Sequence, residues 1–340
     1  MRKSTRYSLL LMLALIVALA VAIALRKKAP PEVARLLPES DAIVYANLKP
    51  LRLATHFDRT IVTRSPDYQH FVDATGIMPE RDLDEVAFAL HRMDDPNGPN
   101  GPVAYSEVFD GRFDGDRLAR YLASIATAKE NYAGHDIYTI PVGEANAGHE
   151  RLLRVTQLGY DTVAASNMPT TEQIHSILDR YRAAASPFAG SSLLSARYGD
   201  VPLLSSAWGI GHIGLPFSER GRISVLGLEL PLPEDTTFVA SLQYRGVVRL
   251  RIDEIAPTEA DAQKSAESLT TLLGIFKSIE HVRPGAIQDQ AIADAVNSLK
   301  IQQHGERAVL TADIPMSLLR QLATANGQVS TSTGVSPASH

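Results

Sequence analysis

The pattern of apolar and polar positions predicts an α+β protein behind one long apolar segment. Short apolar runs bounded by turn residues predict strands, and apolar positions spaced by three and four predict amphipathic helices. The predicted strands cover residues 42–48, 84–93, 103–109, 137–140, 152–158, 162–165, 236–244, 247–255, 299–303 and 308–312. The predicted helices cover residues 66–75, 114–128, a segment opened by Pro169, 258–279, 286–299 and 315–325. These elements indicate antiparallel sheets with helices packed on one face.

The second half of the chain has its elements in the same order as the first half, which suggests an internal duplication. A shift of 146 residues aligns residues 154–173 with residues 300–319 without a gap. The identities in this alignment are Gln157 with Gln303, Gly159 with Gly305, Val163 with Val309, and Pro169 with Pro315. We therefore expect two related lobes, residues 36–200 and 201–325, followed by a disordered tail over residues 326–340.

The first apolar segment predicts a membrane anchor. Leu9 to Leu25 contains 17 residues without a charged side chain, and basic residues flank it on both sides. As a helix it spans about 25 Å, close to the thickness of the hydrocarbon core. Ala22 to Ala24 resembles a signal-cleavage site, but three basic residues follow at once, which favours an uncleaved signal-anchor over residues 8–25.

The numbers of basic residues on the two sides of the apolar segment are nearly equal, so they do not decide the orientation of the anchor in the membrane. A large domain that follows a first hydrophobic segment is commonly exported, and we use this to assign the orientation. We expect a single-pass protein of the cell membrane, N-in and C-out, in the cell envelope. Residues 29–35 are then a linker, and the lobes lie in the periplasm or an equivalent space.

Composition narrows the function classes. The formal net charge is −5, and residues 29–340 carry 27 basic against 38 acidic side chains once the first 28 residues are set aside. A domain this acidic lacks the basic patches that nucleic acid requires, so no nucleic acid partner is expected. The chain has no cysteine, which excludes disulfides, thiolate metal sites and cysteine nucleophiles.

The motifs that suggest chemistry do not meet its requirements. Gly209 to Gly214 matches the dinucleotide-binding glycine pattern, but Pro216 follows where a helix must begin, so this segment is interpreted as an apolar linker or lid. Asp110 to Asp116 lacks the ligand spacing of a calcium loop. The ten histidines show no metal-binding spacing, and no nucleophile elbow is present. We expect no cofactor, no metal and no catalytic residue that the sequence can identify.

Three residues are candidate contacts for a ligand or partner: Trp208, His212 and Phe217. Trp208 is the only tryptophan and stands beside an apolar stretch, although a lone tryptophan is more often part of a core. An apolar loop there offers a surface for lipid or for another protein.

The segment from Leu36 to Leu53, LLPESDAIVYANLKPLRL, follows the single apolar helix, and Ala312-Asp313-Ile314-Pro315 precedes the last predicted helix. In both features the chain resembles a family of uncharacterised bacterial membrane-anchored extracytoplasmic proteins with a duplicated α+β domain. The resemblance implies an envelope location and the repeated fold. It implies no catalytic residue.

Three hypotheses for function remain open. The first is a non-enzymatic interaction or accessory protein of the envelope that binds another envelope protein. The second is a binding module for a small or lipidic ligand held between the lobes, where clefts commonly bind ligands. The third is a hydrolase whose active-site residues are scattered along the chain and meet only in the fold.

Overall fold

The computed structural model describes residues 29–59, 65–142, 151–183, 190–212, 223–225, 228–230, 236–244, 247–282 and 290–317. The predicted anchor over residues 8–25 and the predicted tail over residues 326–340 lie outside this part of the chain, as does Phe217. Within the described residues, no helix is long and apolar enough to cross a membrane.

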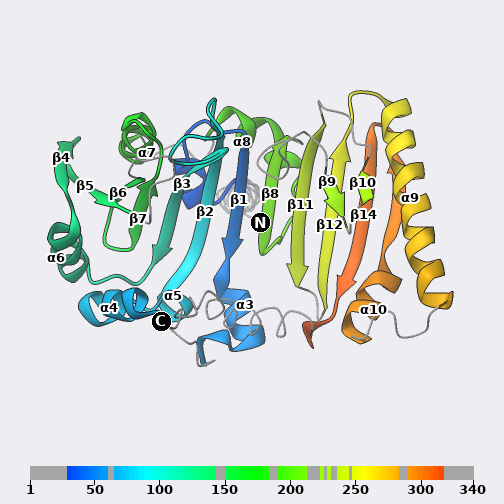
Figure 1. Ribbon diagram of the computed structural model, residues 1–340, viewed down its shortest axis with the longest axis horizontal. Coiled ribbons are helices and arrows are strands. Elements are labelled where there is room, and N and C mark those ends of the chain that lie inside the picture. Colours follow the sequence, from blue (N-terminus) through cyan, green and yellow to red (C-terminus); the bar gives the residue numbers. More distant parts are fainter. Residues whose placement is uncertain are drawn as a thin grey trace, which may run out of the picture.

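Twelve strands form one antiparallel sheet in the order β13-β14-β12-β11-β8-β1-β2-β3-β7-β6-β5-β4 (Figure 1). A separate two-stranded sheet pairs β9 (Ile223–Val225) with β10 (Leu228–Leu230). The strands of the large sheet are β1 (Ala42–Asn47), β2 (Leu83–Arg92), β3 (Val103–Gly111), β4 (Ala128–Tyr132), β5 (His135–Pro141), β6 (Leu152–Gln157), β7 (Thr162–Ser166), β8 (Ala207–His212), β11 (Thr237–Tyr244), β12 (Val248–Ile255), β13 (Lys300–His304) and β14 (Arg307–Ile314). The prediction of an α+β protein with a large antiparallel sheet is confirmed.

Helices connect the strands and begin at local signals in the sequence. In α4 the hydroxyl of Ser65 accepts a hydrogen bond from the backbone N–H of Tyr68, Pro66 occupies the first turn, and Gly76 ends the helix with a φ of 74°. The helices are α2 (Glu32–Leu36), α3 (Leu48–Thr55), α4 (Pro66–Thr75), α5 (Pro79–Asp82), α6 (Gly115–Ile125), α7 (Glu172–Arg182), α8 (Ser192–Arg197), α9 (Glu259–Val282) and α10 (Gln290–Ser298). The boundaries predicted for α4 are therefore confirmed.

Helices cover both faces of the sheet in residues 29–200, so the expectation that they pack on one face is wrong there. Strand β7 shows the reason, because its buried residues alternate between two cores. Val163 packs in a core with Leu118 and Leu122 of α6, whereas Ala164 packs in a core with Ile177 of α7. We call these two sides of the sheet the α6 face and the α7 face. Helix α9 also lies on the α6 face. Its Ser265 donates a hydrogen bond to Glu254 of β12, and the strand register places Glu254 on that face.

The strand order repeats between the two halves of the sheet. The first half runs β1-β2-β3-β7-β6 and the second runs β8-β11-β12-β14-β13, with α6 and α9 in equivalent places along the chain. The aligned glutamines also make the same contact: the side-chain amide of Gln157 donates to the carbonyl of Gly159 at 2.8 Å, and that of Gln303 donates to the carbonyl of Gly305 at 2.6 Å.

The two halves join through the antiparallel pair β1 and β8, whose ladder is centred on Val44 and Gly209. A local two-fold axis through this pair relates the two strand orders. One sheet therefore continues across the lobe boundary predicted at residue 200.

Two local predictions are wrong. Pro169 does not open a helix, because α7 begins at Glu172. The predicted helix over 114–128 ends at Ile125, and residues 128–132 form strand β4 at the edge of the sheet. Polar edge strands such as β4 give no alternating signal because neither of their faces is buried, and its burial pattern is exposed throughout except at Tyr132.

Candidate ligand groove

The floor of a groove is formed by small residues on the α6 face of β1 and β8. Ala42, Val44 and Ala46 alternate on this face of β1, and the register pairs them with Gly211, Gly209 and an alanine of β8. A Cβ atom on Gly211 would lie 2.6 Å from the Cβ of Ala42, so glycine is required there. A Cβ atom on Gly209 would lie 3.6 Å from the backbone oxygen of Ile43 and 3.7 Å from the side chain of Val44, both ordinary van der Waals contacts. The floor is low because these strands carry almost no side-chain bulk on this face.

Larger apolar side chains of β11 and β12 form one wall. The cavity has a volume of about 490 Å³, and its surface is almost wholly apolar. The strands β1, β8 and β11 that line it stand at the middle of the sheet, between the edges near which α6 and α9 lie (Figure 1). The wall residues are Phe238, Leu242, Leu250 and Ile252.

Trp208 belongs to the core on the opposite face of β8. Its side chain is 3% exposed and stacks on Tyr45 with 5.4 Å between ring centroids, while Tyr198 meets it edge-on at 5.4 Å. Burial raises the pKa of Tyr45 above its usual range, with the Glu85 carboxylate acting in the same direction. The indole of Trp208 therefore packs in the core on the face of β8 opposite to Gly209, and Trp208 also borders the groove as a residue of that strand.

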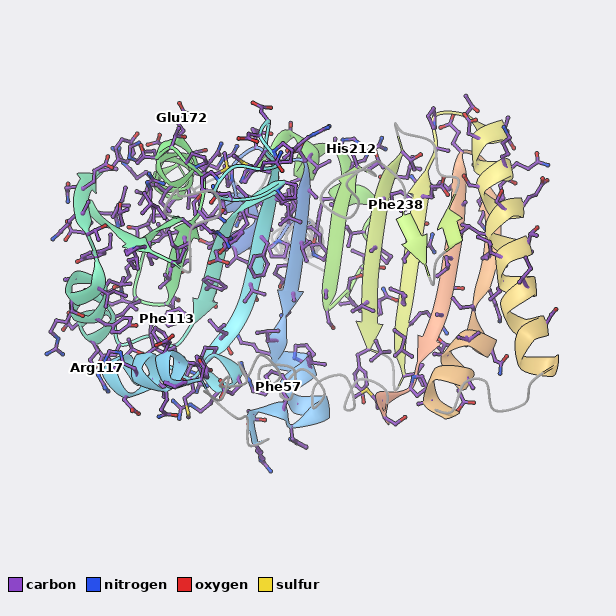
Figure 2. All side chains as sticks on the ribbon, in the orientation of Figure 1. Phe57, Phe113, Arg117, Glu172, His212 and Phe238 are labelled. Carbon is purple, nitrogen blue, oxygen red and sulfur yellow. The ribbon has the colours of Figure 1, made fainter. Side chains whose placement is uncertain are left out.

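Residues 209–212 are the last four of the six residues of β8, so their interpretation as part of a linker or lid is wrong. Gly209 and Gly211 pair with both β1 and β11. The glycines serve close packing and the low floor, without the strand-to-helix turn that a dinucleotide requires. His212 ends β8 and lines the groove (Figure 2). Its Nδ1 lies 3.3 Å from the hydroxyl of Thr237.

One carboxyl group stands on the same apolar face, two strands away from β1. Glu107 of β3 lies opposite Phe88 of β2 and Ala165 of β7. Among the described residues its carboxyl makes no hydrogen bond or ion pair, and burial raises the pKa of that carboxyl to about 7. A carboxyl in such surroundings is partly protonated near neutral pH.

A histidine and two serines meet in the fold, which is the arrangement that the hydrolase hypothesis requires. His91 Nε2 lies 3.0 Å from the hydroxyl of Ser106, which lies 3.0 Å from the hydroxyl of Ser166. All three side chains are buried, and neither serine hydroxyl is open to a substrate. Burial also lowers the pKa of His91. The group cross-links β2, β3 and β7 and lies outside the groove.

A second hollow, of about 650 Å³, lies near the hairpin that joins β6 and β7. Its polar groups already have protein partners: His135 Nδ1 lies 2.9 Å from the carbonyl of Gln157, and Asp136 accepts an ion pair from Lys129 at 2.7 Å. It therefore offers fewer free groups for recognition than its volume suggests. Among the described residues, no three histidines, aspartates or glutamates are placed to hold a metal ion.

One hypothesis from the sequence placed a ligand between the lobes, but it did not identify the small residues that form the groove, although the sequence contains a signal for them. Ala42 to Ala46 and Ala207 to Gly211 both place small residues at every second position of a strand. Such alternation is compatible with a covered sheet as well as an open one, and only the pairing of the two strands brings both rows of small residues together.

No protein-family model matches the chain, and no curated protein matches it. Among solved structures, the chain is similar to TP0453 in three crystal forms. Crystal forms IV and I give a TM-score of 0.44 at 13% and 12% identity, covering 87% and 88% of this chain and 96% and 98% of that chain. Crystal form III gives 0.45 at 12% identity, covering 88% of this chain and 99% of that chain.

Proposed function

We propose that this chain is a membrane-anchored extracytoplasmic binding protein, built from two related halves, that holds an elongated apolar ligand in the groove where the halves join. The single observation that carries the proposal is the groove itself, an almost wholly apolar hollow over glycine and alanine residues of β1 and β8. Sequence reasoning alone favoured an accessory protein without a ligand. The groove favours the binding module instead, with its site at the junction.

The lining restricts the ligand to a long hydrocarbon chain. The groove contributes few polar groups, so apolar burial must supply the affinity. Each buried methylene contributes about 0.8 kcal/mol, and association itself costs at least about 4 kcal/mol. A chain of about four carbons therefore gains too little, whereas a chain of about twelve gains about 10 kcal/mol before that cost. We expect affinity to rise steeply from butyrate to palmitate.

Gly209 allows a direct test, because a Cβ there lies on the groove face of β8 and makes only ordinary van der Waals contacts. Gly209→Leu fills the floor, and Gly199→Leu is the matched control because a Cβ on Gly199 meets nothing within 4 Å. Residues 29–340 are incubated with palmitate and examined by native mass spectrometry without detergent. We expect one palmitate on the unaltered sequence and on Gly199→Leu, and none on Gly209→Leu. Absence of palmitate from all three proteins, or its retention by Gly209→Leu, would refute the proposed site.

The predicted orientation needs a separate test. Because the chain has no cysteine, a single Asp94→Cys substitution provides one thiol in an exposed loop of the soluble domain. In intact cells, labelling by a thiol reagent that does not cross the cytoplasmic membrane is the result expected for N-in, C-out. Labelling only after that membrane is permeabilised would place the domain inside.

A further inference from the structure

One row of side-chain positions crosses the α6 face through the floor of the groove and continues beyond it. The register of the neighbouring strands fixes this row. From β3 to β12 it consists of Glu107, Phe88, Val44, Gly209, Ala240 and Ile252. The four positions from Val44 to Ile252 line the groove. Phe88 and Glu107 therefore extend the row past the groove on the side of β1.

The two-fold axis between Val44 and Gly209 makes Glu107 and Ile252 equivalent positions, and their chemistry differs. Each lies two strands away from the axis pair on its own side of the sheet. Ile252 continues the apolar lining, whereas Glu107 places a carboxyl at the corresponding point. The other carboxyl near Ile252 is Glu254, which is 2% exposed and accepts a hydrogen bond from Ser265 of α9 at 2.7 Å, so it belongs to the packing of that helix. The row thus has one polar end and one apolar end.

Glu107 stands at the border of the part of the sheet that α6 covers. Ala165, its neighbour in β7, is buried in the core beneath α6. Phe88, its neighbour in β2, is only half-buried, as are Val44 and Glu107 itself. The described residues therefore cover the carboxyl more fully from the side of β7 than from the side of the groove.

No cation among the described residues offsets the charge of Glu107. Burial alone raises the pKa of its carboxyl. The titratable group that interacts with it is Tyr105, two residues away on β3: burial raises the pKa of Tyr105, the Glu107 carboxylate adds to the rise, and Arg151 opposes it. A partly buried carboxylate without a partner costs stability, and such a departure from the rules of folding is typical of a functional position.

The chemistry of this lone acceptor selects the head of the ligand. A carboxylate in apolar surroundings forms its strongest hydrogen bonds with a positively charged donor, such as an ammonium group. An anionic head meets a like charge there, and a hydroxyl forms only the weaker bond of a neutral donor. The excess of acidic over basic side chains in residues 29–340 attracts a cationic ligand as well.

We propose that the ligand of the groove is an amphiphile with a primary amine head, whose ammonium group binds Glu107 while its hydrocarbon chain lies across β1 and β8; this rests on the proposed function. Neighbouring strands lie about 4.8 Å apart, so β3 is about 10 Å from β1. A chain that fills the groove needs to cross only β2 to bring its head to Glu107. An acid such as palmitate is held by its chain alone.

Three probes with the same chain test the choice of head. Each has a hexadecyl chain that carries a diazirine, and the head is a primary amine, a carboxylate or a hydroxyl. The full chain is placed in phosphatidylcholine nanodiscs, illuminated with each probe and digested, and labelling of the peptides that contain β1 and β8 is measured by mass spectrometry. Labelling of each variant is divided by that of the unaltered protein, so differences in how the probes enter lipid cancel.

Glu107→Gln removes the charge and keeps the shape of the side chain, and Glu172→Gln, at an exposed site, is the matched control. We expect Glu107→Gln to lower labelling by the amine probe about tenfold or more and to change labelling by the hydroxyl probe far less. Glu172→Gln should change neither.

Gly209→Leu separates failure of this inference from failure of the proposed function. It should abolish labelling of these peptides by all three probes. If it does so while Glu107→Gln leaves labelling by the amine probe unchanged, the groove binds chains without selecting the head, and the inference is overturned alone. Stronger labelling by the carboxylate probe than by the amine probe, lost in Glu107→Gln, also overturns it. If no probe labels these peptides in the unaltered protein, the proposed function and the inference fall together.

Discussion

Glu107 provides the sharpest test of the electrostatics on the α6 face. Its carboxyl lies among apolar residues of neighbouring strands, and burial raises its pKa from 4.5 to about 7. One pKa unit corresponds to 1.36 kcal/mol, so this shift amounts to about 3 kcal/mol of stability. Because the side chain keeps partial access to water, we expect the measured value to be about 2 kcal/mol or somewhat more.

The sign follows from which state of the protein loses its proton first. As pH rises above 4.5, the unfolded chain releases the Glu107 proton while the folded protein still holds it. The contribution of this group to stability therefore falls between pH 4.5 and about pH 7 and is constant above that range. Glu107→Gln removes the titration and keeps nearly the same shape.

The assay is urea unfolding of residues 29–340 and of the Glu107→Gln variant at pH 4.5 and pH 8. We expect the two proteins to differ little at pH 4.5 and the variant to be more stable by about 2 kcal/mol or more at pH 8. Glu172→Gln, at an exposed site, is the control and should give the same small difference at both pH values. Equal differences at pH 4.5 and pH 8 for Glu107→Gln would refute the reasoning.

Three further changes test other parts of the fold. Burial lowers the pKa of His91, so the unfolded chain takes up a proton before the folded protein does, and stability is lost as pH falls below about 6.5. His91→Asn removes this titration. The difference in melting temperature between the unaltered protein and His91→Asn should therefore be smaller at pH 5 than at pH 7. Gly111→Ala places a Cβ against the carbonyl oxygen of Asp82 and should cost about 1–3 kcal/mol in urea unfolding, whereas Gly199→Ala should be neutral. Thr258→Ala removes the hydroxyl that caps α9 and should cost about 1 kcal/mol in the same assay; no change would mean that the cap does not hold the helix.

Sequence periodicity predicted most elements because their burial is strongly one-sided. Helix α7 buries Ile174, Ile177 and Leu178 and leaves its other side chains half-buried or exposed, so its apolar spacing is easy to identify. Strand β8 was missed in part because Gly209 and Gly211 have weak strand propensity and matched another motif. The pairing with β1 and β11 overrides that propensity.

The candidate site needed the pairing of distant strands, which periodicity does not give. Trp208 and Gly209 are neighbours in sequence, yet their side-chain positions face opposite sides of the sheet. Trp208 is conspicuous in the sequence because of its size, whereas the groove depends on Gly209 for its lack of a side chain. Residues that create space carry a weaker sequence signal than residues that fill it.

The repeated strand order explains why an open apolar strip lies at the middle of the sheet. On the α6 face, α6 packs over the outer strands of the first half, and α9 packs over β13 and β14 of the second. A two-fold axis through Val44 and Gly209 puts these helices near opposite edges of the sheet, so neither covers the central strands β1 and β8.

The α7 face of the same two strands is different, because Ile43 and Ile210 are buried there beneath other elements of the core. The same pair of strands is therefore filled and sealed on one side, whereas on the other side it is low and neither α6 nor α9 covers it. A fold that needed only stability would place bulk on both sides. Small residues at the junction keep the groove open where both halves can contribute to it, which is why we place ligand binding on the axis and not within either half.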